Sequence, residues 1–220
     1  MARPATTIES VQAALDRLHH AVAAGQSRTR CLRRWSEMVR ERDDHRCVDC
    51  HSTRNLSAHH ICRKVFLPEA EFQTGNGITL CRDCHVGLHR GFNGRPDTTE
   101  PMDAQGGEKL RQMERLYCIL DQDAVERDRL QPGFYDLSEQ VLAKFKLFMG
   151  FDPDTVFPGP PVRQAYLIWA QTSLSVRRAI AAANGAPMTD GPILPGEAYI
   201  VIGGDAGEQV GMTIKDPRWY

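Results

Sequence analysis

Two Cys-x-x-Cys pairs constrain the fold of this chain more than any other feature. They are Cys47/Cys50 and Cys81/Cys84, and 30 residues separate them in the 220-residue sequence. A two-residue gap lets both sulfurs of a pair face one ion, and two pairs supply the four thiolates of a tetrahedral zinc site. We therefore expect a structural zinc that provides much of the folding free energy of a small, loop-rich segment.

The insertion between the two pairs carries polar residues at spacings that a zinc staple does not need. His59 and His60 end a short apolar-polar alternation, which predicts a strand that presents the two imidazoles to opposite faces. Asn76 begins a turn that leads into a returning strand. A short helix is expected from Cys84, with two further histidines on one face, one turn apart. These histidines are His85 and His89.

This order of elements resembles the HNH endonuclease family and its ββα-metal fold. The resemblance covers about residues 35–92 and implies metal-dependent hydrolysis of phosphodiester bonds in DNA, with restriction, phage defence or mobile elements as the usual context. The matching residues are Cys47, Cys50, His59-His60-Ile61, Asn76, Cys81, Cys84 and His85, with His89 matching members that use a third histidine ligand.

The resemblance implies a role for each residue of the site. His60 would be the general base that takes a proton from the attacking water. Asn76 would hold the catalytic loop and orient His60 through a backbone carbonyl. A single divalent ion at the scissile phosphate would be held by His59, His85 and His89. Many family members have Asp at the position of His59, and imidazoles favour Zn²⁺, Ni²⁺ or Mn²⁺ over Mg²⁺, so all four stay open as the catalytic ion.

Positive charge is concentrated in the half of the chain that holds these motifs. The net charge is −1, but residues 1–95 carry 15 Lys and Arg against 10 Asp and Glu, whereas residues 96–220 carry 12 against 18. Arg63 and Lys64 follow the His-His strand and could contact nucleic acid or be solvated loop residues. The arginines of 27–46 could likewise contact phosphates or form a solvated face. They should lie on the exposed side of a helix that has Trp35 in the core.

The full chain is expected to be an α+β protein with four parts. Residues 1–46 form partly basic N-terminal helices, 47–92 the nuclease module, 93–107 a Gly- and Pro-rich linker, and 108–220 a mainly helical region of open role. Short strands at 198–202 and 210–214 predict a terminal β-hairpin.

Composition limits the class of protein and its partners. The apolar fraction of 41% and charged fraction of 25% are typical of globular chains, and with neither a spanning apolar run nor a signal sequence we expect a cytoplasmic protein without membrane contact. DNA is the expected partner, and a regulatory protein such as an ATPase is an alternative docking partner for the C-terminal region. The non-catalytic alternative is a zinc module that only binds nucleic acid or protein. The oligomeric state stays open.

Overall fold

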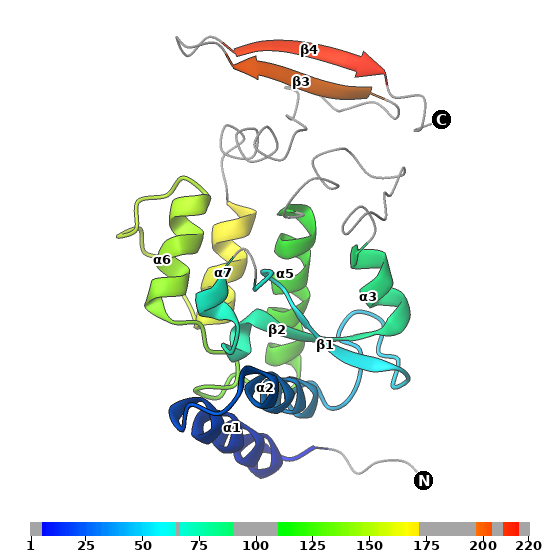
Figure 1. Ribbon diagram of the computed structural model, residues 1–220, viewed down its shortest axis with the longest axis vertical. Coiled ribbons are helices and arrows are strands. Elements are labelled where there is room, and N and C mark those ends of the chain that lie inside the picture. The colour runs from blue at the N-terminus through cyan, green and yellow to red at the C-terminus, as the bar shows by residue number, and fades with distance from the viewer. Residues whose placement is uncertain (1–5, 65–66, 90–109, 172–196, 204–208, 216–220) are drawn as a thin grey trace.

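The computed structural model describes residues 6–64, 67–89, 110–171, 197–203 and 209–215 (Figure 1). Within these ranges the chain combines helices with two small antiparallel sheets of two strands each, which confirms the α+β class. The predicted linker, residues 93–107, lies outside the described residues. The helices of the described ranges are all too short or too polar to cross a membrane.

Two N-terminal helices pack side by side beneath the central sheet (Figure 1). Helix α1, Ile8–Ala23, begins at Thr7, whose hydroxyl accepts a hydrogen bond from the Ser10 N–H while the Ser10 hydroxyl caps the Thr7 N–H. Helix α2, Arg28–Arg42, buries one stripe of side chains at helical spacing. That stripe includes Trp35, as predicted, at 2% exposure.

The central hairpin carries the motifs of the insertion. Strand β1, Leu56–His60, pairs antiparallel with β2, Gly77–Cys81, and His60 lies opposite Gly77. Every residue of β2 is buried, because α2 packs against this sheet. Helix α3, Arg82–His89, follows β2 directly and begins two residues before the predicted start. Between the strands lie two 3₁₀ turns, η1 at Pro68–Ala70 and η2 at Thr74–Asn76.

Three further helices complete the core on the other side of the central hairpin (Figure 1). They are α5, Leu110–Glu126; α6, Glu139–Phe148; and α7, Pro161–Ala170. Phe145 joins them by edge-to-face contacts with Tyr117 and Trp169, at centroid distances of 5.8 and 5.4 Å. Their buried side chains form one continuous hydrophobic cluster with those of α1, α2 and the hairpin. The predicted terminal hairpin consists of β3, Glu197–Gly203, and β4, Gln209–Lys215.

Arg42 departs from the prediction that the arginines of α2 lie on an exposed side. Its side chain is 0% exposed, and the guanidinium stacks on the Tyr135 ring at 4.2 Å. All five N–H donors are used: two bind the Asp43 carboxylate at 2.7 and 3.1 Å, and three bind backbone carbonyls. The carbonyls are those of Thr74 (2.7 Å), Gly77 (2.7 Å) and Phe134 (3.2 Å). Burial of this charge is tolerated because every donor is paired.

Candidate functional site

The four motif cysteines converge on one point. Cys47 and Cys50 lie in the turn before β1, whereas Cys81 ends β2 and Cys84 lies in the first turn of α3. Their sulfur atoms all lie within 4.8 Å of one another, and Cys50 Sγ is 3.5 Å from Cys81 Sγ. Zn–S bonds of about 2.3 Å place the sulfurs of a tetrahedral site about 3.8 Å apart, so the donor set fits a metal such as zinc.

Backbone N–H groups at the start of α3 favour the thiolate form of one of these cysteines, which is the form that binds metal. A hydrogen bond from the backbone N–H of Cys84, with a second from that of Asp83, lowers the pKa of Cys81 to about 7 despite burial of the sulfur. Burial raises the pKa of Cys84 instead. A cation that binds all four sulfurs displaces the remaining protons, so affinity rises with pH.

Three histidines form a second cluster beside the first. His59 lies on β1, His85 and His89 lie on α3, and their ligand nitrogens all fall within 4.8 Å of one another. The Nε2 atoms of His85 and His89 are 2.9 Å apart. The Ser57 hydroxyl lies 3.1 Å from Nδ1 of His85, which turns the Nε2 of that ring toward the cluster.

The electrostatics of this cluster favour the metal-binding form of imidazole. Burial, followed by the charges of His85 and His89, lowers the pKa of His59 to about 3. Burial also lowers the pKa of His85, and His89 adds to the effect. A neutral imidazole binds metal through its lone pair, and the close approach of the three side chains fits one divalent ion that prefers nitrogen ligands.

His60 faces away from this cluster, as the strand alternation predicted. Its ring stacks on the Trp35 indole, with centroids 3.9 Å apart and planes 6° from parallel. Its Nε2 lies 2.9 Å from the carbonyl oxygen of Glu71. A carbonyl only accepts, so Nε2 carries the proton and Nδ1 carries the lone pair. Burial lowers the pKa of His60 even though the Glu71 carbonyl opposes this, so the ring is neutral at neutral pH.

Asn76 holds the loop that surrounds His60. It is 0% exposed, and its Oδ1 accepts a hydrogen bond from the Cys62 N–H at 2.8 Å. Its Nδ2 donates to the carbonyls of Cys62 (3.0 Å) and Ala70 (3.1 Å). Because Ala70 directly precedes Glu71, Asn76 fixes the segment whose carbonyl binds His60.

Arg63 and Lys64 lie in the loop that follows β1, and both are partly exposed. The charge of Lys64 contributes to the lowered pKa of His60, as does that of Arg28 on α2. Arg28 also pairs with the Glu71 carboxylate at 2.6 Å. Two basic side chains, Lys64 and Arg28, therefore lie close enough to the His60 ring to act on it electrostatically.

Several residues of the site were not singled out by sequence reasoning. Ser57 could have been identified from the sequence, because the two-residue period of a strand places it on the face of His59. Three other contacts could not, since each joins segments far apart in the sequence: those of Trp35 and Glu71 with His60, and that of Tyr117 with Asn76. Of the cysteines outside the cluster, Cys31 and Cys62 are buried, whereas Cys118 is only partly buried.

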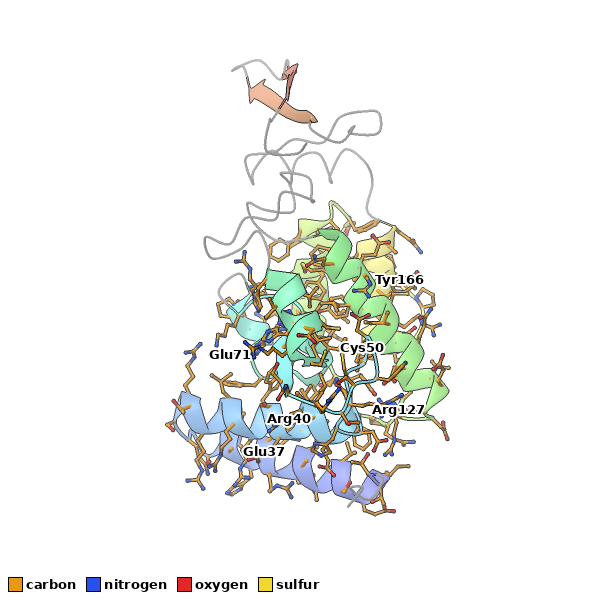
Figure 2. All side chains as sticks on the ribbon, turned by 90° about the vertical axis from the view of Figure 1, so that its right-hand side faces the viewer. Glu37, Arg40, Cys50, Glu71, Arg127 and Tyr166 are labelled. Carbon is orange, nitrogen blue, oxygen red and sulfur yellow. The ribbon has the colours of Figure 1, made fainter. Side chains whose placement is uncertain are left out.

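Figure 2 shows Cys50 and Glu71 at separate places above α2. Cys50 belongs to the thiol cluster and the Glu71 carbonyl contacts His60, so the site has two distinct parts. Comparison with protein-family models, curated proteins and solved structures finds no match for this chain.

Proposed function

We propose that this chain is a metal-dependent endonuclease of the HNH type that hydrolyses phosphodiester bonds in DNA. The observation that supports it best is that two adjacent histidines of β1 lie in different surroundings. His60 holds a free Nδ1 lone pair beside basic side chains, while the adjacent His59 lies in a cluster with the imidazoles of His85 and His89. Hydrolysis of a phosphodiester is assisted by a general base and by a metal ion at the phosphate, and adjacent residues of β1 would contribute to the two.

Each side chain then has one task. His59, His85 and His89 would hold a divalent ion, and the four cysteines a structural zinc. The divalent ion supplies charge stabilisation at the scissile phosphate. Nδ1 of His60 takes the proton from the attacking water, while the Glu71 carbonyl keeps the other proton on Nε2 and stabilises the imidazolium that forms. Asn76 positions this carbonyl through Ala70.

Cleavage of plasmid DNA by a His60→Gln variant tests the proposal. With Mg²⁺, Mn²⁺, Ni²⁺ or Zn²⁺ added in separate reactions, the wild-type chain should nick or linearise the plasmid. Loss of a general base costs about 10²–10⁴-fold in rate, and the variant should keep its zinc content and circular dichroism spectrum. His20→Gln, on the exposed face of α1, is the matched control and should cut like the wild type.

Two outcomes would contradict the proposal. Undiminished cutting by His60→Gln removes His60 from the role of base. A wild-type chain that retards DNA in a gel shift but yields no product with any of the four ions would instead support the zinc-dependent binding module.

A further inference from the structure

We infer that Trp35 is a positioning residue for His60, setting the plane in which the imidazole presents its Nδ1 lone pair. The inference rests on the proposed nuclease function, because it concerns the base of that reaction. Trp35 lies on α2, outside the central hairpin, and sequence reasoning assigns it only to the core.

The stack and the Glu71 hydrogen bond restrain different motions of the imidazole. A histidine ring rotates broadly about its χ2 torsion when nothing holds it. The indole, 3.9 Å away and 6° from parallel, blocks that rotation by covering one whole face of the ring. The bond from Nε2 to the Glu71 carbonyl fixes the direction within the ring plane. Together the two contacts fix the direction in which the Nδ1 lone pair points. A proton acceptor needs such a fixed orientation for rapid transfer.

Two further contacts hold the indole in place. Its Nε1–H donates to the Gln73 carbonyl at 3.1 Å. The ring also packs close to Gly77, the residue opposite His60 in the β1–β2 ladder. A Cβ at Gly77 would lie 2.7 Å from Cζ2 of Trp35 and 2.6 Å from Cγ2 of Val39. The absence of a side chain opposite His60 therefore creates the space that the indole fills.

A purely structural role for Trp35 makes a different prediction, and Trp169 allows the two to be compared. Both tryptophans are 2% exposed, so their truncation removes similar apolar area. Trp169 packs edge-on against Phe145 among the C-terminal helices, whereas Trp35 stacks face to face on His60. An effect that follows from core packing alone should appear in both, and an effect on the base only at Trp35.

The experiment compares Trp35→Phe and Trp35→Leu with Trp169→Phe and Trp169→Leu in the full chain. One readout is kcat and KM for cleavage of a labelled DNA duplex, measured below the unfolding temperature of every variant. The other is the Cε1–H resonance of His60 in ¹³C-histidine-labelled protein, identified by its loss in His60→Gln. The indole ring current should place this resonance upfield of the other histidines in the wild type.

We expect Trp35→Leu to abolish the upfield shift and lower kcat about 10- to 100-fold, with KM changed less than about threefold. Trp35→Phe, which keeps a flat ring, should retain part of the shift and lose less than about tenfold in kcat. The Trp169 variants should lose stability while the resonance stays in place and kcat stays within about twofold.

The inference is overturned if Trp35→Leu lowers kcat no more than Trp169→Leu, or if the His60 resonance does not move. If Trp35→Leu fails to fold, the comparison of the two Phe variants decides. A wild-type chain that cuts no DNA refutes the nuclease proposal and the catalytic purpose of the stack, while the resonance still shows whether Trp35 orients His60.

Discussion

The hydroxyl of Tyr117 on α5 lies 3.3 Å from Oδ1 of Asn76, so a helix beyond residue 107 reaches the residue that holds the loop around His60. The same helix contacts the first cysteine pair, where Arg115 donates a hydrogen bond to Asp49. Arg127, labelled in Figure 2, lies at the end of this helix and donates to the Arg42 carbonyl at 2.7 Å. Helix α5 is therefore a structural support of both parts of the candidate site.

Asn76→Ala should destabilise the protein by about 2–4 kcal/mol, because it leaves the N–H of Cys62 and two carbonyls without their partner in a buried place. Asn76→Asp should destabilise the protein at least as much, since it sets a carboxylate oxygen against the same carbonyls of Cys62 and Ala70. Urea denaturation measures both. Wild-type stability in Asn76→Asp would show that these carbonyls do not need the amide.

Arg42→Lys should cost about 3–5 kcal/mol, because an ammonium cannot make the five bonds of the guanidinium and leaves Asp43 partly unpaired in the core. Arg33→Lys on the same helix is the control. The Arg33 side chain is 62% exposed, so its change should be under about 0.5 kcal/mol. Equal effects of the two substitutions in urea denaturation would contradict the account of the buried network.

Cys81→Ser should abolish retention of one zinc equivalent per chain. Structural zinc sites bind with on the order of 10 kcal/mol, which is comparable to the stability of a whole domain, so the variant should also lose its cooperative unfolding transition. Cys31→Ser replaces another buried thiol, outside the cluster, and should keep the metal. Zinc content after dialysis and circular dichroism report the two effects. A full zinc equivalent in Cys81→Ser would remove that sulfur from the ligand set.

Ser57→Ala should weaken binding of a divalent ion at the histidine cluster about 10- to 100-fold, since the hydroxyl orients His85 through Nδ1. Calorimetric titration with Ni²⁺, on protein whose cysteine site is already filled with zinc, measures the affinity. Ser52→Ala, whose hydroxyl accepts only from the Arg54 N–H among the hydrogen bonds resolved, should bind Ni²⁺ like the wild type. Equal affinities in the two variants would contradict the role of Ser57.

Asp44 should make the free energy of unfolding decrease at acid pH. Burial raises the pKa of this carboxyl, but two hydrogen bonds from Thr6 and the charges of Arg127 and Arg129 outweigh burial and lower it. The unfolded chain therefore binds this proton more readily, and the stabilisation is lost as pH falls through the folded-state pKa. Asp44→Asn should cost less than about 1 kcal/mol at pH 7, because the group is partly exposed.

The difference between wild type and Asp44→Asn should shrink as the pH falls below about 4, the unfolded-state pKa, and should vanish only below the lower folded-state pKa. Asparagine suits the backbone here, since residue 44 has a φ of 57°. Thermal denaturation at several pH values measures the difference. A constant difference between pH 7 and 3 would contradict the assignment.

Local periodicity was enough to predict α1, α2, β1 and the position of the histidines on α3, because each pattern lies within one element. The convergence of the four thiols was also predictable, since Cys-x-x-Cys spacing follows from metal geometry. The burial of Arg42 was not, because its carbonyl acceptors come from two distant segments, 74–77 and residue 134, that only the folded chain brings together. The stack of Trp35 on His60 depends in the same way on tertiary packing.

Because His59 and His60 alternate along β1, we expect insertion or deletion of a residue in this strand to be more damaging than substitution of most of its side chains. A slip of one residue in the pairing of β1 with β2 would turn every side chain to the other face. His60 would then point to the imidazoles of α3, and His59 to the indole of Trp35. A one-residue deletion within the strand that spares His59 and His60 would thus displace both imidazoles from their present neighbours at once, although both would still be present in the chain.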